Sequence, residues 1–303
     1  MRKAISLATF VFTYLLNAHG WSHEAHERIA SLAHDLMKED KRAELQSILI
    51  SGKPLPKWMV EVSTWADGPG ALEDGGNHFV HVSSCRNPSI ELQCGSSKSG
   101  GGVCIVEALV RNIQRAITSP TGESLRESLM YIIHYMADIH QPLHVALESD
   151  AGGNTIKGLR PFSAAARHDV SLHELWDIQL YQLAKNKSMF KDGFPKYNTT
   201  TMDFTLEDLE SEDSIRNLVA QIALQTATQV TCEVAYWSSP SQRGKSMPSG
   251  TFLDGDYIKN GREWTVIQVA RAGIRLASLL SSIVESRAAA RAAAAARNSV
   301  IAA

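Results

Sequence analysis

The most restrictive feature of the sequence is an apolar helical segment that also carries an imidazole and a carboxylate. From Ser124 to Ile139 the residues are mostly apolar and follow a helical pattern, which Pro142 brings to an end. His134 and Asp138 are four residues apart in this segment, so both side chains lie on the same face of the helix. A single pair at this spacing is usually a surface hydrogen bond, and it gains meaning only from other residues of the same kind.

A second pair at the same spacing strengthens the case for a metal site. His173 and Asp177 are again four residues apart, and His144 follows ten residues after His134. Two such pairs on separate helices can point into the core of one helical bundle. Neutral imidazole and carboxylate groups suit zinc, so the sequence predicts zinc binding between two helices.

Helical periodicity dominates the remaining chain, and no internal repeat is visible. Apolar stripes predict helices over residues 22–38, 103–118, 171–185, 206–236 and 261–297. His78 to Ser83 fits a short extended piece, and the segments 84–102 and 238–250 are rich in Gly, Ser or Pro and predict loops. Neither segment resembles a linker between domains, so we expect a single all-α domain. Arg287 to Arg297 is Ala-rich with spaced arginines and predicts a solvated helical extension, so we expect the domain over residues 21–286 and an extension over 287–303.

The N-terminus has the pattern of a cleaved secretory signal over residues 1–20. Arg2 and Lys3 precede an apolar run that is too short to span a bilayer, and small residues precede Trp21. Cleavage before Trp21 would give a secreted or luminal protein, and we expect no membrane anchor. The whole chain has 30 Lys and Arg against 32 Asp and Glu, so bulk charge cannot attract a polyanion. An anionic substrate would need local cations such as metal ions.

Export also implies an oxidising compartment. The even number of four cysteines, with none in a CxxC pair, predicts two disulfides and not a cysteine zinc site. Sequence alone allows three pairings. Asn186 and Asn198 begin sequons that would accept N-glycans in a eukaryotic host.

Four further residues are candidate ligands. Signal cleavage would free the α-amino group of Trp21, whose pKa of about 8 is low enough for a metal to displace the proton. His26 lies just after this terminus, Asp67 belongs to Trp65-Ala66-Asp67, and His78 adds another imidazole.

Together these segments resemble the zinc-dependent S1/P1-type nuclease family. The matching pieces cover nearly the whole chain after the signal and occur in the family's order. They are Trp21 with His26, Trp65-Ala66-Asp67, His78-Phe79, the run from His134 to His144, Asp150-Ala-Gly-Gly-Asn154, His173 to Asp177, and Ala272-Gly-Ile-Arg-Leu-Ala277. The resemblance implies a helical fold of the phospholipase C/P1 nuclease type, with three Zn²⁺ ions in a cleft.

The resemblance also implies a ligand set, in which all nine positions have the family's residue types. The first zinc would take Asp67, His78, His134 and Asp138. The second would take Trp21 through its amine and carbonyl, His26, and Asp138 as a bridge. The third would take His144, His173 and Asp177. Asp67 and Asp138 are therefore the expected catalytic carboxylates, whereas His140 faces away from His134 and is expected to be structural.

The implied activity is cleavage of single-stranded DNA and RNA to 5′-nucleotides, with removal of 3′-phosphates from mononucleotides. Zinc lowers the pKa of bound water from about 15.7 towards about 7, which gives a hydroxide nucleophile near neutral pH. Phe79 would stack on the nucleobase, His81 would face it, and Gly152 and Asn154 would clamp it. A base must leave a duplex stack to reach such a pocket, which favours single strands. We expect no obligate protein partner.

The resemblance further implies the disulfides Cys94–Cys104 and Cys85–Cys232. Two positions depart from the family. Gly70 stands where a basic residue usually lies near the scissile phosphate, and His81 stands where an aspartate commonly binds the base. Because a neutral His can donate or accept while a carboxylate only accepts, we expect altered base selectivity.

Two alternatives remain at the level of the sequence. A zinc phospholipase C would share the N-terminal Trp, the helical fold and the trinuclear site. A secreted zinc-binding protein without turnover would account for Gly70 and His81.

Overall fold

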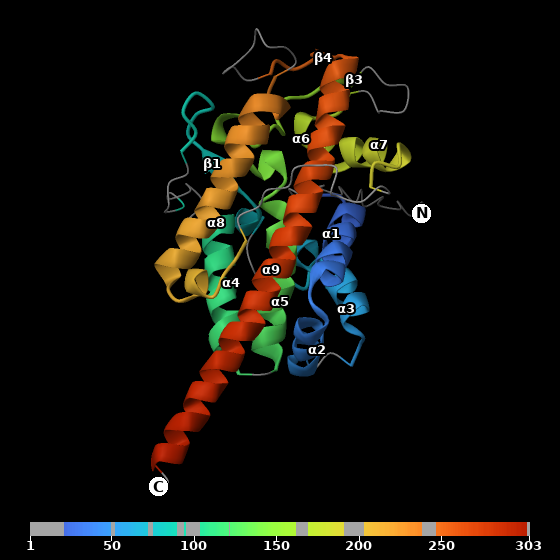
Figure 1. Ribbon diagram of the computed structural model, residues 1–303. Coiled ribbons are helices and arrows are strands. Elements are labelled where there is room, and N and C mark those ends of the chain that lie inside the picture. Colours follow the sequence, from blue (N-terminus) through green and yellow to red (C-terminus); the bar gives the residue numbers. More distant parts are fainter. Residues whose placement is uncertain are drawn as a thin grey trace, which may run out of the picture.

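The computed structural model describes residues 21–49, 52–71, 75–89, 94, 104–120, 122–161, 169–190, 203–237 and 247–301. The expected signal segment and Asn198 lie outside these ranges. Helices dominate the fold, as expected, and the strands are short (Figure 1).

One long helix, α9 (Gly255–Ile301), runs through the molecule and organises the others (Figure 1). It packs against α1 (His23–Leu36), α4 (Ile105–Thr118), α5 (Glu123–Asp138) and α7 (Leu180–Asn186). By length and composition α9 could cross a membrane, but 78% of its apolar stretch is buried inside the protein, as in a core helix. The helix begins six residues before the predicted start at 261 and continues to Ile301.

The contact between α1 and α9 depends on a glycine. A Cβ atom on Gly273 would lie 2.5 Å from Leu32 Cδ2 and 2.8 Å from Leu32 Cγ. Real Cβ atoms do not approach other atoms this closely, so any larger residue at position 273 would force Leu32 of α1 to move. This explains the glycine in the motif Ala272-Gly-Ile-Arg-Leu-Ala277.

Two helices after α1 escaped the prediction from sequence. They are α2 (Glu39–Ile48), which buries only Leu45 and Ile48, and α3 (Leu55–Val62), which begins after Pro54. The two buried residues of α2 are too few to produce an apolar stripe, whereas α3 buries a stripe that the sequence does contain, Leu55, Trp58, Met59 and Val62. α2 packs against α9 and α3, and α3 packs against α1 and α5.

The predicted helix over 206–236 is divided. It comprises η7 (Glu207–Leu209), α8 (Glu212–Thr226) and a π-helical segment, η8 (Ala227–Ala235). Ser211 separates the first two, because its hydroxyl accepts a hydrogen bond from Ser214 N–H and caps α8. The predicted helix over 171–185 likewise comprises α6 (Leu172–Glu174), the π-helical η5 (Leu175–Gln179) and α7.

The strands form two small parallel pairs. β1 (Val80–Val82) pairs with β2 (Val145–Leu147), and β3 (Arg160–Pro161) pairs with β4 (Phe252–Leu253). β1 lies within the predicted extended piece. The others were not predicted, because two or three residues are too short for an alternating pattern.

Arg287 lies at the start of the predicted extension, yet its side chain is buried. Its guanidinium donates hydrogen bonds to the carbonyl oxygens of Ala116, Ile117 and Ser119, at the end of α4. Further along α9, Arg291 pairs with Glu44 of α2 at 2.6 Å, and residues 289–299 are exposed. The part of α9 beyond Arg291 projects from the body of the protein (Figure 1).

Candidate active site

The first candidate metal-binding group joins α1 to α5. It comprises His26, His134 and Asp138, whose ligand atoms lie within 4.8 Å of one another. The rings of His26 and His134 stack with centroids 4.3 Å apart. His26 Nε2 lies 3.3 Å from Asp138 Oδ1, and His134 Nε2 lies 3.0 Å from Asp138 Oδ2.

The second group shares His134 with the first. It adds Asp67, from η1 (Trp65–Asp67), and His78, from η2 (Gly75–His78). Asp67 Oδ1 lies 3.5 Å from His134 Nε2 and 3.7 Å from His78 Nδ1. His78 Nδ1 also lies 2.9 Å from Asp138 Oδ2, so Asp138 lies between the two groups.

The third group comprises His144, His173 and Asp177. His144 ends η3 (Pro142–His144), and the other two come from α6 and η5. His173 Nε2 lies 3.2 Å from Asp177 Oδ2, and the His144 ring lies 5.2 Å from the His173 ring. The structure thus brings the eight predicted side-chain ligands into three neighbouring groups.

Backbone carbonyl groups fix the orientation of three imidazoles. The Nδ1 atoms of His134, His144 and His173 lie 2.7, 2.6 and 2.8 Å from the carbonyl oxygens of Ser63, His78 and Gly152. A carbonyl oxygen only accepts, so each Nδ1 carries the proton and donates it. Each Nε2 is therefore the ring nitrogen that a metal ion can bind, in the form without its proton.

The electrostatics of the groups also favour a cation. Burial alone would lower the pKa of His134, but the carboxylates of Asp138 and Asp67 outweigh it and raise the pKa to about 10. For His26 and His144 desolvation dominates and lowers the pKa, which keeps them neutral. His134 therefore holds a proton where a metal ion would supply the positive charge.

Several polar atoms of the groups are buried without a hydrogen bond within the part of the chain that the structure describes. They are His26 Nε2, His144 Nε2, Asp67 Oδ2 and Asp138 Oδ1. Buried polar atoms normally have a hydrogen-bond partner, so these atoms, which include the facing pair His26 Nε2 and Asp138 Oδ1, are available as ligands. The nitrogen and oxygen donors, their burial and their proximity all fit zinc.

Trp21 lies between the groups. Its side chain is fully buried, and its indole N–H donates to Ala137 O at 3.1 Å, next to Asp138. The following residue, Ser22, donates its N–H to Asp177 O at 3.0 Å. The main chain at this position is therefore held between α5 and η5, which carry ligands of different groups.

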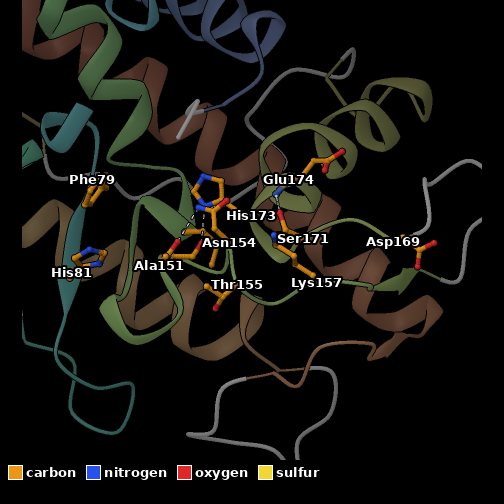
Figure 2. A pocket seen from close by; sticks show the side chains of 12 residues that line it. Phe79, His81, Ala151, Asn154, Thr155, Lys157, Asp169, Ser171, His173 and Glu174 are labelled. Carbon is orange, nitrogen blue, oxygen red and sulfur yellow. Dashed lines mark hydrogen bonds between the residues drawn. The ribbon is translucent and has the colours of Figure 1, made fainter. Parts of the chain in front are cut away.

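A pocket of about 600 Å³ opens beside the third group. Figure 2 shows Phe79 and His81 on one side, Asn154 and His173 in the middle, and Lys157 and Asp169 on the other side. Gly152 also lines it, so all four predicted base-binding residues share this pocket. The rings of Phe79 and His81 lie 5.0 Å apart. Because His173 lines the pocket and belongs to the third group, a ligand here would reach the metal-binding groups.

Gly70, one of the two departures noted in the sequence, lies against Trp65 of η1. A Cβ atom on Gly70 would lie 3.3 Å from Trp65 Nε1. Of the described residues that line the pocket, Lys157 alone is a lysine or arginine. No motif in the sequence singles out Lys157.

Sequence reasoning also missed two side chains that support the groups. Gln141 donates a hydrogen bond from Nε2 to Asp177 Oδ1, and its Oε1 accepts from Leu143 N–H. Asp150 accepts from Gly153 N–H and from the Tyr236 hydroxyl, both at 2.8 Å. Asp150 begins the motif Asp150-Ala-Gly-Gly-Asn154, but the sequence indicates no role for it. Gln141 lies between the predicted ligands His134 and His144.

Both disulfides have the implied pairing. Cys85–Cys232 ties the segment after β1 to η8, and Cys94–Cys104 closes a short loop before α4. Asn186 is exposed at the end of α7, so its side chain is accessible to a glycan.

Three buried His/Asp groups beside a pocket in an α-helical bundle form a candidate metal centre that a ligand can reach. The S1/P1 Nuclease family model matches residues 21–285, and the chain belongs to this family. It is therefore a nuclease, a hydrolase of the endonuclease type, and the family assignment favours this activity over a phospholipase C.

Similar proteins include nucleases from plants and fungi. Endonuclease 2 of Arabidopsis thaliana is 25% identical, covering 93% of this chain and 98% of its own. Nuclease S1 of Aspergillus oryzae is 26% identical, covering 92% and 96%, and Nuclease P1 of Penicillium citrinum is 24% identical, covering 87% and 97%.

Proposed function

We propose that the protein is a secreted nuclease that uses three Zn²⁺ ions to hydrolyse single-stranded DNA and RNA to 5′-nucleotides. It would also remove 3′-phosphates from nucleotides. The observation that carries the proposal is the arrangement of three His/Asp groups beside one pocket, with Asp138 between two groups and His173 on the pocket wall.

The proposed ligand set follows the groups. One zinc ion would be held by Asp67, His78, His134 and Asp138, a second by the Trp21 amine and carbonyl, His26 and Asp138, and a third by His144, His173 and Asp177. Zinc supplies Lewis acidity, which lowers the pKa of a bound water and stabilises developing negative charge on the phosphate and leaving oxygen. The ions also supply the positive charge that a protein of formal charge −2 lacks.

The chain's own residues then orient the substrate and move the proton. Phe79 would stack on a nucleobase, while His81, Gly152 and Asn154 contact its edges. Asp67 Oδ2 has no hydrogen bond within the described residues, so it can accept the proton of the attacking water. Asp138 keeps His26, His78 and His134 oriented in one cluster. Stacking between Phe79 and a base requires an unpaired base, which favours single strands.

The family model matches the chain from residue 21 onward, which supports a signal segment over residues 1–20 that is cleaved before Trp21. The nuclease domain would then cover residues 21–286, followed by the extension 287–303. Glycans on Asn186 and Asn198 are part of the same proposal.

The test is a substrate panel with the protein that begins at Trp21. Single-stranded DNA, single-stranded RNA, duplex DNA, 3′-AMP and phosphatidylcholine are incubated with and without a chelator, and bound metal is measured. We expect about three zinc ions per chain and chelator-sensitive hydrolysis of the single strands and of 3′-AMP. Full zinc loading without hydrolysis of any phosphoester would contradict the proposal and favour a metal-binding role.

A further inference from the structure

A buried carboxylate, Asp150, holds the turn that forms the floor of the pocket. Asp150 Oδ1 accepts hydrogen bonds from Gly153 N–H and from the Tyr236 hydroxyl, each at 2.8 Å. The backbone carbonyl of Asp150 accepts from Thr155 N–H and from its hydroxyl, each at 3.1 Å. Both ends of the turn are therefore fixed to one residue, which is itself 5% exposed.

The same turn orients a candidate zinc ligand. The Gly152 carbonyl accepts the Nδ1 proton of His173 at 2.8 Å, which leaves His173 Nε2 directed at Asp177. Gly152 has φ of +61°, and a Cβ atom there would lie 2.6 Å from the Leu143 carbonyl oxygen. The turn therefore has little room to shift without moving the imidazole. Because Asn154 of the turn and His173 both line the pocket, one short segment serves base binding and metal binding (Figure 2).

A chain of hydrogen bonds returns from Tyr236 to the third group. The Tyr257 hydroxyl donates to Ala235 O at 2.7 Å, next to Tyr236, and Trp176 Nε1–H donates to the Tyr257 hydroxyl at 3.0 Å. Trp176 directly precedes Asp177 in η5. All of these side chains are buried, so the bonds are shielded from water. Two links are covalent, from Ala235 to Tyr236 and from Trp176 to Asp177, and the others are hydrogen bonds. Together they form a closed circuit from His173 through the turn, Asp150, Tyr236 and Tyr257 to Asp177.

We propose that Asp150 and Tyr236 are positioning residues that couple nucleoside binding in the pocket to zinc binding at His144, His173 and Asp177. This inference rests on the proposed function. Because the hydrogen bonds of Asp150 hold the turn as one rigid unit, a displacement of His173 on zinc binding is transmitted through Gly152 to Asn154 in the pocket wall. The coupling is reciprocal: zinc strengthens nucleoside binding by the same factor as the nucleoside strengthens zinc binding.

The experiment measures both affinities in the protein that begins at Trp21. Adenosine, guanosine, cytidine and uridine are titrated by calorimetry, and the nucleoside that binds tightest is kept as the probe. Zinc affinity is measured by chelator competition with and without saturating probe. We expect a coupling factor of about 5 to 10, equivalent to a typical allosteric free energy of about 1–1.4 kcal/mol. His144→Ala, which removes a ligand of the third group alone, should weaken probe binding by a similar factor.

Three variants test the positioning residues. Tyr236→Phe deletes one hydroxyl and should bring the coupling factor close to 1, with a larger rise in KM than loss of kcat for a single-stranded oligonucleotide. Asp150→Asn retains an oxygen acceptor and should keep most of the coupling, whereas Asp150→Ala should lose it. Ser282→Ala is the control, because it also deletes a buried hydroxyl that bonds to a carbonyl, that of Phe204, outside the circuit. Circular dichroism establishes whether each variant is folded. If Asp150→Ala does not fold, Tyr236→Phe still tests the inference.

The outcomes separate the inference from the proposed function. If the unmodified protein binds zinc and a nucleoside with a coupling factor of 1, or if Tyr236→Phe leaves the factor unchanged, the inference is wrong and the proposed function stands. If the unmodified protein binds no zinc or no nucleoside, the proposed function itself is wrong.

Discussion

Arg275 of α9 donates a hydrogen bond to His140 Nε2 at 2.7 Å, inside the bundle just past the end of α5. His140 Nδ1 in turn donates to Met136 O at 2.7 Å. Burial and the charge of Arg275 both lower the pKa of His140 well below its usual value, so His140 is neutral and accepts from the guanidinium. His140 thus connects the long helix to the segment that carries Asp138, and it lies outside the three metal-binding groups.

Two histidines on α1 allow a matched test of the metal site. We expect His26→Ala to lose about one zinc ion per chain and to lower nuclease activity by about 100-fold or more. Loss of a residue that merely supports a ligand already costs about 10- to 100-fold in other metal sites. His23→Ala, three residues earlier and exposed, should change neither. Zinc content by mass spectrometry under native conditions and turnover of a single-stranded oligonucleotide provide the measurements, and equal effects of both variants would contradict the ligand assignment.

The N-terminus offers a second test. One extra residue before Trp21 would turn its amine into an amide, which is a poor metal ligand. We expect loss of one zinc ion and of most activity, although Trp21 keeps its buried indole contact with Ala137. A control that replaces Ser22 with Ala retains the free amine. Full zinc loading and turnover in the extended protein would refute a role for the amine.

The contact between Gly273 and Leu32 predicts a loss of stability that can be rescued. Gly273→Ala places a methyl group against Leu32 and should lower the free energy of unfolding by about 1–3 kcal/mol. Adding Leu32→Ala makes room for that methyl, so the double variant should lose less than the sum of the two single losses. Gly75→Ala is the control, since nothing lies within 4 Å of its Cβ. Urea denaturation measures all four variants, and strict additivity would contradict the steric explanation.

We expect His81 to influence which nucleobase the protein prefers. His81→Asp replaces a group that donates or accepts with one that only accepts, so it should shift the relative kcat/KM among the four homopolymers. The backbone and the neighbouring Phe79 are unchanged by this substitution, and the overall fold should be retained. Identical rank orders in both proteins would exclude His81 as a contact to the base.

The hydrogen bonds of Arg287 indicate how much of the C-terminal extension can be removed without loss of stability. A chain that ends at Ser286 loses the guanidinium that binds three carbonyl groups at the end of α4. We expect this truncation to cost about 1.5–3 kcal/mol, the usual range for a hydrogen bond to a charged group. A chain that ends at Ala290 should keep nearly full stability. If the two truncations unfold at the same temperature, Arg287 contributes nothing measurable and the boundary at 286 is adequate.

The sequence predicted the site well because its side chains follow simple spacing. His134 with Asp138, and His173 with Asp177, lie four residues apart, and each pair lies in one metal-binding group. The spacing survives even the π-helical turn of η5, because that turn still places residues four apart on one face of the helix. The metal count and the individual ligands stay predictions, as does the role of each base-binding residue.

What the sequence could not supply are contacts made by backbone atoms. The carbonyl oxygens of Ser63, His78 and Gly152 orient three imidazoles, and every residue has a carbonyl group. α2 was missed for a different reason, because it buries only Leu45 and Ile48 and so leaves no apolar stripe in the sequence. The role of Asp150 depends on Tyr236, which lies 86 residues away and whose proximity no local pattern reveals.

The outer end of α9 has a practical consequence for the use of this protein as a reagent. From Arg291 to Ile301 the helix rises about 1.5 Å per residue, so its tip stands roughly 15 Å beyond the last ion pair with the body. A surface linker or fused reporter joined there would sit on a rigid spacer at the end opposite to the β3–β4 pair (Figure 1). Immobilised in this way, the nuclease would keep its pocket open to long nucleic acid strands.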